Sequence, residues 1–176
     1  SSFYELDCKP QSYNPLFLAT VEEERNGQNG MKLAVSCLPK VDVALIGEPT
    51  GMQPAVAEKG LMVLDFTVRG KAGHAARNEG INALYRATEL IEKLRTFSFD
   101  KVSDLLGPVK FTITMINAGT QHNVIPDTCT FTADVRTNEL YSNHEVFDLI
   151  SAELPDYCEV KARSFNLHSS RIDVNH

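Results

Sequence analysis

The pattern of apolar residues changes near residue 60, and this change does most to limit what the chain can fold into. Before it, apolar runs are nearly continuous and end in acidic residues: residues 15–20 lead into Glu22, and residues 41–46 lead into Gly47 and Glu48. Such runs are typical of strands covered on both faces, as in a parallel α/β sheet. Two strands cannot make that sheet alone, and the stretch between them is long enough for a short crossover helix. We therefore expect the first 59 residues to be part of an α/β domain.

From residue 60 onward, apolar and polar residues alternate, which indicates a sheet with one covered face. Four strands are expected, around residues 62–68, 109–115, 129–135 and 158–162. Apolar spacing predicts a helix between the first two strands, and the capping-box spacing of Ser142 and Glu145 predicts the start of another before the fourth. The order strand, helix, strand, strand, helix, strand is that of a ferredoxin-like α+β fold. The expected core residues are Met62, Leu64, Phe66 and Val68; Ile81, Leu84, Tyr85, Thr88, Ile91 and Leu94; Val109, Phe111, Ile113 and Met115; Cys129, Phe131, Ala133 and Val135; Val146, Phe147, Ile150 and Leu154; and Cys158, Val160 and Ala162.

Composition excludes several function classes. The chain of 176 residues has 17 Lys and Arg against 23 Asp and Glu, a formal charge of −6, and it has no long basic cluster. Binding to nucleic acid or to an anionic membrane surface depends on concentrated positive charge and is disfavoured, as is an RNA-binding ferredoxin-like domain, because the strands lack its aromatic pattern. No apolar run is long enough to span a membrane, and the first ten residues do not resemble a signal peptide. We expect a cytoplasmic protein.

The four cysteines, Cys8, Cys37, Cys129 and Cys158, are widely scattered and form no C-x-x-C pair. We expect reduced thiols, because a chain this long and apolar needs no disulfide framework. Cys129 and Cys158 fall on the apolar side of alternating strands and are expected in the core.

Carboxylates follow both apolar runs of the first segment. An isolated acidic run such as residues 22–24 is usually a solvated turn. Here, however, it follows an apparently buried strand, and Glu48 follows the next one, so both lie where ligands bind in open α/β sheets. A divalent cation would compensate the clustered negative charge, and carboxylate oxygen is a normal zinc ligand. The residues alone leave both interpretations open.

Three further features are weak individually. His74 lies in a glycine-containing loop between a strand and a helix, residues 119–126 form a polar loop between two strands, and Arg136 ends the third strand. A loop histidine is usually a solvated side chain, and the polar loop could be a long hairpin connection. Arg136 could bind a carboxylate through two hydrogen bonds, but arginine is common at strand ends.

Together these segments resemble the M20 family of dinuclear zinc amidohydrolases, which includes acetylornithine deacetylase, succinyl-diaminopimelate desuccinylase, aminoacylase and carboxypeptidase G2. The segments that carry the resemblance are Ala-Thr-Val-Glu-Glu-Glu at 19–24, Leu-Ile-Gly-Glu-Pro-Thr at 45–50, Gly-Lys-Ala-Gly-His-Ala-Ala at 70–76 and Gly-Thr-Gln-His-Asn-Val-Ile-Pro at 119–126. Their order and spacing match those of the family, and the set spans nearly all of the chain. Residues 47–54, 117–123 and 169–171 are most similar to acetylornithine deacetylases of arginine biosynthesis.

The resemblance implies a ferredoxin-like lid and dimerisation domain inserted in a zinc-peptidase-like α/β catalytic domain. The expected boundaries are 1–59 for part of the catalytic domain, 60–166 for the lid, and 167–176 for the return to the catalytic domain. The implied activity is hydrolysis of the linear amide bond of an N-acyl amino acid by a homodimer that associates through its lid. The implied cofactor is zinc, two ions per active site, with cobalt as an alternative metal.

The resemblance also implies a role for each site residue. Glu23 would be the general base, and Glu24 and Glu48 would each ligate one zinc. His74 would stabilise the oxyanion of the tetrahedral intermediate in the active site of the partner subunit. Asn123 and Arg136 would hold the polar and carboxylate groups of the substrate.

One departure from the family pattern affects the metal site. The family also needs a His-x-Asp segment upstream, whose aspartate bridges the two ions, and a histidine far downstream, and neither is present. We therefore expect these 176 residues by themselves to bind zinc poorly and to be inactive. Other hypotheses are another M20 hydrolase, such as succinyl-diaminopimelate desuccinylase, an aminoacylase or a dipeptidase, and a non-catalytic ferredoxin-like dimerisation module.

Overall fold

A computed structural model describes residues 9–10, 12–22, 27–47 and 49–172. The chain divides into two compact units, residues 1–49 and residues 50–176. None of the helices in the described ranges has the length and apolar character needed to cross a membrane.

The first unit contains one regular element in its described part, the helix α2 (Met31–Cys37). It follows Gly30 and stops before Pro39, because the residue preceding a proline is disfavoured in helical conformation. This helix lies where a crossover helix is expected. The two strands expected at 15–20 and 41–46 are absent from the described residues, and Leu45 is 99% exposed. That expectation is wrong here because a strand covered on both faces needs strands on either side of it, and the described part of the first unit contains only the helix α2.

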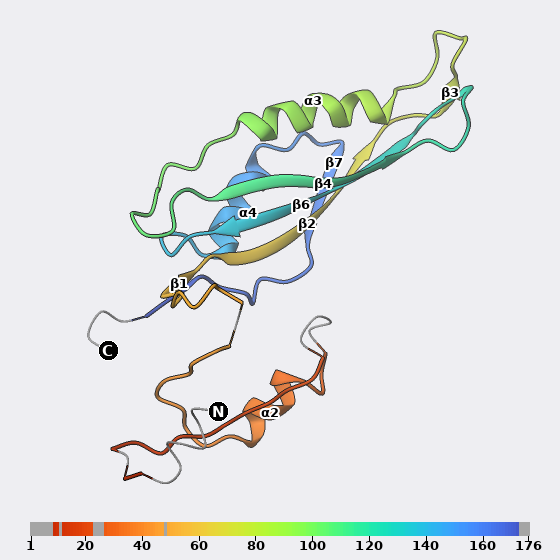
Figure 1. The fold of residues 1–176 in the computed structure, drawn as a ribbon. Helices are drawn as coiled ribbons and strands as arrows, with labels where there is room; N and C mark the ends of the chain where they lie inside the picture. Colours follow the sequence, from red (N-terminus) through yellow and green to blue (C-terminus); the bar gives the residue numbers. More distant parts are fainter. Residues whose placement is uncertain (1–8, 11, 23–26, 48, 173–176) are drawn as a thin grey trace. The chain divides into compact units, whose positions relative to one another are not determined.

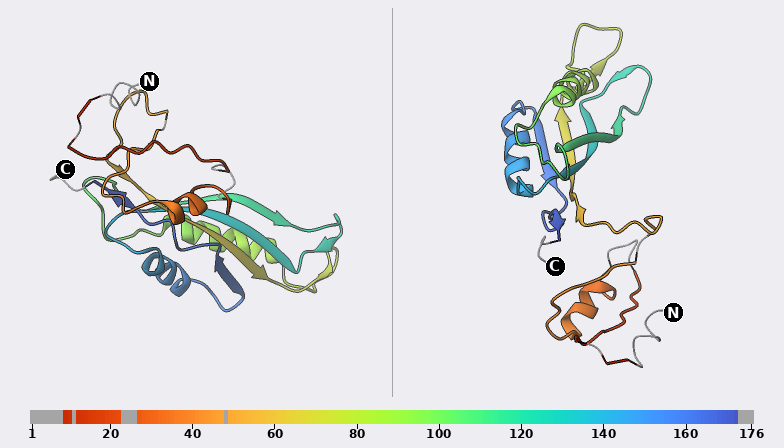
Figure 2. Two further views of the ribbon diagram at one scale, coloured as in Figure 1. Left: turned by 90° about the horizontal axis from the view of Figure 1, so that it is seen from below. Right: turned by 60° about the vertical axis from the view of Figure 1, so that its left-hand side comes forward.

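The second unit is built on a four-stranded antiparallel sheet (Figure 1). Its strands are β2 (Gly60–Arg69), β4 (Lys110–Ala118), β6 (Thr128–Thr137) and β7 (Cys158–Ala162), in the spatial order β4-β6-β2-β7. The helix α3 (Ala83–Thr96) connects β2 to β4, and α4 (Asn143–Ala152) connects β6 to β7. Both helices pack on the same face of the sheet (Figure 2). This topology confirms the ferredoxin-like α+β fold.

Two short ladders extend from this unit. At one end, β1 (Ala57–Glu58) pairs with β8 (Ser170–Arg171), so the chain segments that enter and leave the domain run side by side. At the other end, β3 (Gly73–His74) pairs with β5 (Val124–Ile125) and joins two of the loops singled out in the sequence.

The helices α3 and α4 begin at side-chain caps. Asn82 accepts a hydrogen bond from the backbone N–H of Leu84 at the start of α3. At the start of α4, the Ser142 hydroxyl accepts from the Glu145 N–H, and the Glu145 carboxylate accepts from the Ser142 N–H. The expected capping box is therefore confirmed.

The core lies between the sheet and the two helices. The alternating residues of β2 and β6 are buried as expected, and the rings of Phe66 and Phe131 stack across the two strands with centroids 4.4 Å apart. Cys129 and Cys158 are buried free thiols, as expected. Burial raises the pKa of the Cys158 thiol to about 11, so it behaves as a small apolar side chain.

The buried face of α3 is only partly the expected one: Leu94 is buried and Ile91 packs against the core as expected. The expected stripe included Ile81, Leu84, Tyr85 and Thr88, but these residues are exposed, and Tyr85 is 68% exposed. The residues that face the sheet are Ala83, Ala87, Leu90 and Leu94. Small alanines at the first two positions let the helix backbone approach the strands closely, whereas larger side chains there would overfill the core.

A bulge in β4 breaks the expected alternation of that strand. Ile113 is opposite Ala133, but the register then shifts, so that Met115 is opposite Thr132 and Ile116 is opposite Phe131. Thr114 is the extra residue, and the bulge moves Met115 to the open face of the sheet and Ile116 to the helix-covered face. Met115 is therefore not the core residue that strict alternation predicts.

Candidate active site

The carboxylates expected to act at the metal centre are not placed by the structure. Glu23, Glu24 and Glu48 lie outside the described residues. The neighbouring Glu22 is described, and its carboxylate accepts a hydrogen bond of 3.1 Å from the backbone N–H of Asn29. Among the described residues, no three His, Cys, Asp or Glu side chains form a group that could hold a metal ion. The roles of these three glutamates remain predictions.

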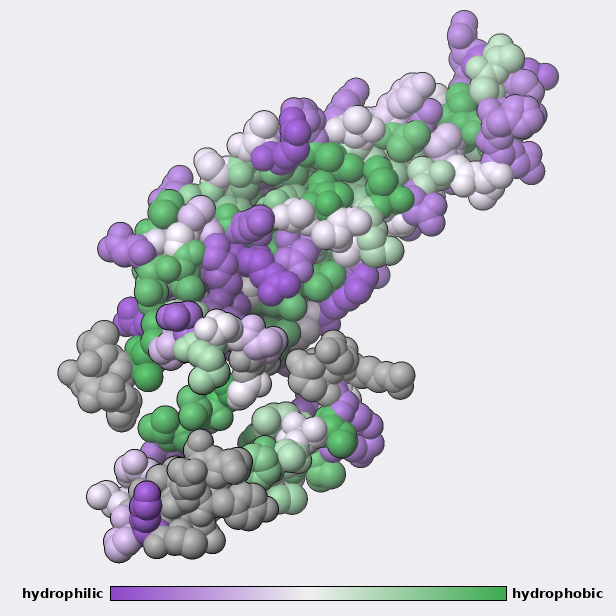
Figure 3. Space-filling view, in the orientation of Figure 1, coloured by the Kyte–Doolittle hydropathy of each residue, from purple (hydrophilic) through white to green (hydrophobic). Residues whose placement is uncertain are grey.

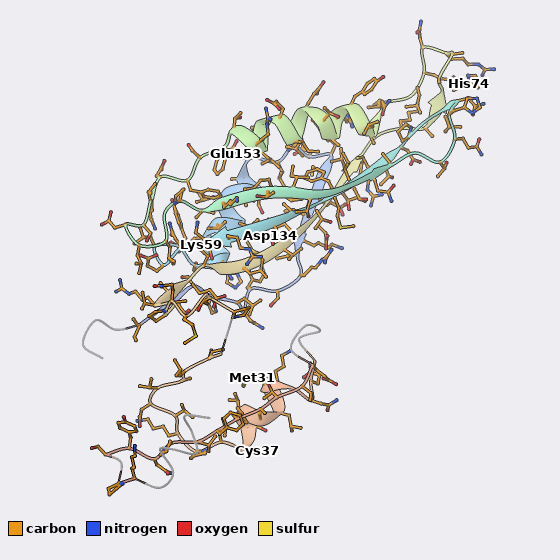
Figure 4. The ribbon with its side chains drawn as sticks, viewed as in Figure 1. Met31, Cys37, Lys59, His74, Asp134 and Glu153 are labelled. Carbon is orange, nitrogen blue, oxygen red and sulfur yellow. The ribbon has the colours of Figure 1, made fainter. Side chains whose placement is uncertain are left out.

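His74 lies at the end of the second unit farthest from the β1–β8 ladder (Figure 4). Its backbone is fixed by the β3–β5 ladder, in which His74 pairs with Val124. The next residue, Ala75, donates its N–H to the carbonyl of Asn123 at 2.9 Å. The structure thus brings the His74 loop and the Asn123 loop together, although they are far apart in the sequence.

A local turn holds the imidazole of His74. The backbone N–H of Ala76 donates to its Nδ1 at 3.1 Å, and the N–H of Arg77 donates to the His74 carbonyl at 2.9 Å. The side chain is otherwise exposed. Glycine is required at position 73, because a Cβ there would lie 2.6 Å from the carbonyl oxygen of Glu79.

Asn123 is half-buried beside a cavity of about 300 Å³. Gly119, with a positive φ of 78°, starts the loop that carries it and adopts a conformation that glycine takes without strain. The cavity is lined by backbone and side chains from both joined loops: Ala72, Gly119, Thr120, Val124, Ile125, Pro126, Asp127 and Thr128.

Arg136 lies near the opposite end of the sheet, on the open face. It is paired with Leu61 at the start of β2, whereas Thr128 of the same strand is paired with Arg69 at the end of β2. The Arg136 Nε and Nη2 donate to the two carboxylate oxygens of Asp134 at 2.7 and 3.0 Å. These hydrogen bonds raise the pKa of Arg136 further and leave three of its five N–H donors available.

The expected site residues therefore do not all meet within one chain. Arg136 lies eight positions after Thr128 along β6, which is roughly 27 Å at about 3.4 Å per residue. His74 and Asn123 lie beyond the Thr128 end. An N-acyl amino acid is only a few times the length of one extended residue, which is about 3.6 Å. One substrate molecule therefore cannot contact Arg136 and also His74 or Asn123 of the same chain.

Sequence reasoning missed two groups next to the site residues. Asp134 lies two residues before Arg136, so strand alternation alone could have placed both on the same face. The hydrogen bond from the Ala76 N–H to His74 could not be predicted from the sequence, because the backbone of any residue except proline provides that donor.

A family model described as the peptidase dimerisation domain of M20 proteins matches residues 56–162, more than half of the chain. This chain belongs to the M20 peptidase family. The family is zinc-dependent, and its members hydrolyse amide bonds.

Its relatives carry more than one activity. An acetylornithine deacetylase of Proteus mirabilis is 32% identical over 162 residues, which cover 87% of this chain and 41% of the relative. An acetylornithine deacetylase of Myxococcus xanthus is 30% identical and is matched over 69% of this chain and 34% of its own length. A succinyl-diaminopimelate desuccinylase of Ruegeria pomeroyi is also 30% identical, over 70% of this chain and 35% of its own length. The chain thus spans between 34% and 41% of the length of these curated relatives.

Solved structures support the fold. The aminopeptidase PepT of Bacillus cereus has a TM-score of 0.53 at 17% identity, covering 69% of this chain and 33% of that one. A putative amidohydrolase/peptidase of Burkholderia cenocepacia has a TM-score of 0.55 at 20% identity, covering 68% of this chain and 31% of that one.

Proposed function

We propose that this chain is the lid and part of the catalytic domain of an enzyme that removes the acyl group from an N-acyl-L-amino acid, N-acetylornithine or N-succinylornithine in arginine biosynthesis. The observation that carries the proposal is the β3–β5 ladder, which joins the His74 loop to the Asn123 loop in a chain of the M20 family. The similarity to two acetylornithine deacetylases supports the ornithine substrate.

Each site residue has one chemical task in this proposal. Glu24 and Glu48 each ligate one zinc, which fits their carboxylate chemistry. Zinc, when bound, polarises the amide carbonyl and lowers the pKa of water. Glu23 takes a proton from the attacking water and passes it to the leaving amine. His74 donates a hydrogen bond to the developing oxyanion, while Asn123 and Arg136 bind the polar and carboxylate groups of the substrate.

The active form is a homodimer that associates through the lid. The dimerisation domain implies a dimer, and the margin formed by α3 and β4 is the surface that suits a second copy. β4 is an edge strand, and Met115 and Ile116 on it are 64% and 52% exposed. Leu84 and Tyr85 are exposed on the adjacent helix, and apolar surface lies along both elements (Figure 3). An unpaired edge with apolar side chains is a template for another strand.

A dimer also explains the separation of the site residues. Since His74 and Asn123 cannot reach the ligand of Arg136 in their own chain, they contribute to the site of the partner subunit. The substrate carboxylate then binds the three N–H donors of Arg136 that Asp134 leaves available.

The function is tested with the full-length, zinc-loaded protein. We expect ornithine release from N-acetylornithine or N-succinylornithine, and Glu23→Gln in the same protein should abolish it. The panel includes N-succinyl-diaminopimelate, because a succinyl-diaminopimelate desuccinylase is among the similar proteins. Release from that substrate alone would reassign the substrate within the family. Glu23→Gln that leaves every activity intact would instead favour a non-catalytic dimerisation module.

A further inference from the structure

The imidazole of His74 has one nitrogen engaged and one free. The N–H of Ala76 donates to Nδ1 at 3.1 Å. In the described part of the chain, Nε2 has no hydrogen-bond partner, and the side chain is exposed. The two nitrogens of this ring are therefore in different surroundings before any ligand binds.

The backbone around the ring is held in place on several sides. His74 and Gly73 are paired with β5, and the N–H of Arg77 closes a turn on the His74 carbonyl. The chain on the far side of the loop packs directly on Gly73: a Cβ there would lie 2.6 Å from the carbonyl oxygen of Glu79. The Ala76 N–H is thus held near Nδ1 by the fold of the loop.

A neutral imidazole carries one proton, so one nitrogen donates and the other accepts. An N–H aimed at Nδ1 requires a lone pair there, and the proton must then reside on Nε2. We propose that the backbone amide of Ala76 is a positioning group that fixes His74 as the Nε2–H tautomer. His74 is then a single hydrogen-bond donor directed away from its loop, toward an anionic or carbonyl oxygen of a ligand.

This assignment separates three roles that a loop histidine can have. A general base or a metal ligand acting through Nε2 needs a lone pair on that atom, and this tautomer has none there. A donor to an oxyanion needs the proton that this tautomer provides. The role of the Nε2–H group as a donor to an oxyanion rests on the proposed function. The tautomer itself follows from the structure of the loop.

The tautomer is measured directly by NMR. The 176-residue chain, labelled with 15N-histidine, is examined at about pH 8, where imidazole is ordinarily neutral. We expect the Nδ1 of His74 to have the shift of an unprotonated ring nitrogen and Nε2 that of a protonated one. A protonated Nδ1, or equal intermediate shifts for both nitrogens, would overturn the proposal.

A pair of variants tests the contribution of the amide. Ala76→Pro removes the N–H, and Ala76→Gly keeps it. We expect the two His74 nitrogen shifts to move toward each other in Ala76→Pro and to stay apart in Ala76→Gly. Shifts unchanged in Ala76→Pro, with the β3–β5 amide signals intact, would contradict a positioning role for Ala76.

A second pair of variants avoids any change in the loop backbone. In the full-length enzyme, the side-chain oxygen of His74→Asn replaces Nδ1, and the amide nitrogen of His74→Gln reaches the position of Nε2. Because the Nε2 donor is the functional group, we expect kcat to fall about a hundredfold or more in His74→Asn. In His74→Gln the loss of kcat should be at least about ten times smaller, and the KM values of the two variants should be similar. Equal or better kcat in His74→Asn would overturn the donor role. If the wild-type protein hydrolyses none of the substrates, the proposed function fails, and the NMR result still decides the tautomer.

Discussion

At the scale of single residues, the open face of the sheet carries two ion pairs, Arg136–Asp134 and Arg163–Asp65. Arg163 donates to both oxygens of Asp65 at 2.7 and 2.9 Å, and the Thr132 hydroxyl adds a third bond at 2.8 Å. The hydrogen bonds from Arg163 are the main reason that the pKa of Asp65 is lowered from its ordinary value. The pair is partly exposed, so solvent screens it.

We predict that Arg163→Met lowers the free energy of unfolding at about pH 7 by less than about 1 kcal/mol. Because the native pKa of Asp65 is lowered, the stabilisation is present above its unfolded value of about 3.9 and is lost as the pH falls through the native value. Urea denaturation at about pH 7 and about pH 3 measures the difference, which should shrink at the lower pH. Lys71→Met removes a charge that forms no ion pair with any described residue and serves as the control. An Arg163→Met effect that is equally large at both pH values would contradict the assignment.

At the scale of elements, close approach decides which side of a helix is buried. Ala83 and Ala87 of α3 are fully buried against the sheet, while Leu84 and Tyr85 face outward. A helix that presented its larger residues to the sheet would sit farther from β2 and β6. The volume of the side chains at the helix–sheet contact therefore decides which face of α3 is buried, and the number of apolar residues on each face does not.

We predict that Ala87→Leu lowers the free energy of unfolding by about 1–3 kcal/mol, because the core has no room for three more carbon atoms. Thr88→Leu adds apolar volume on the adjacent exposed position and should change stability by about 0.5 kcal/mol or less. Urea denaturation followed by far-UV circular dichroism measures both. Similar effects in the two variants would show that α3 does not pack through Ala87.

At the scale of the whole molecule, the proposed dimer rests on the α3–β4 margin. We predict that Tyr85→Glu combined with Ile116→Lys makes the full-length protein a monomer, because both side chains would place a charge in an apolar contact. Sedimentation velocity measures the change. Leu149→Lys alters an exposed leucine on α4 and should leave the dimer intact. A dimer that persists in the double variant would exclude this margin as the interface.

Mixing two inactive variants tests whether a site takes residues from both subunits. His74→Ala and Arg136→Ala should each abolish most activity in the full-length enzyme. In a mixed dimer one site keeps both residues, so random exchange of subunits should restore about a quarter of the wild-type activity. Hydrolysis rates before and after exchange measure it. Activity that does not rise on mixing would show that His74 and Arg136 serve the same subunit or act independently.

The ferredoxin-like order of elements could be predicted from the sequence, because strand alternation and helix caps are local signals. The alternation of β2 and β6 and the capping box of Ser142 and Glu145 are found where the sequence places them. The buried face of α3 and the bulge at Thr114 could not be predicted in this way, since both depend on what each element packs against in the folded chain. The tertiary structure also brings the loops of His74 and Asn123 together, while Arg136 lies at the far end of the sheet. Strand pairing sets such distances, and no local pattern in the chain encodes it.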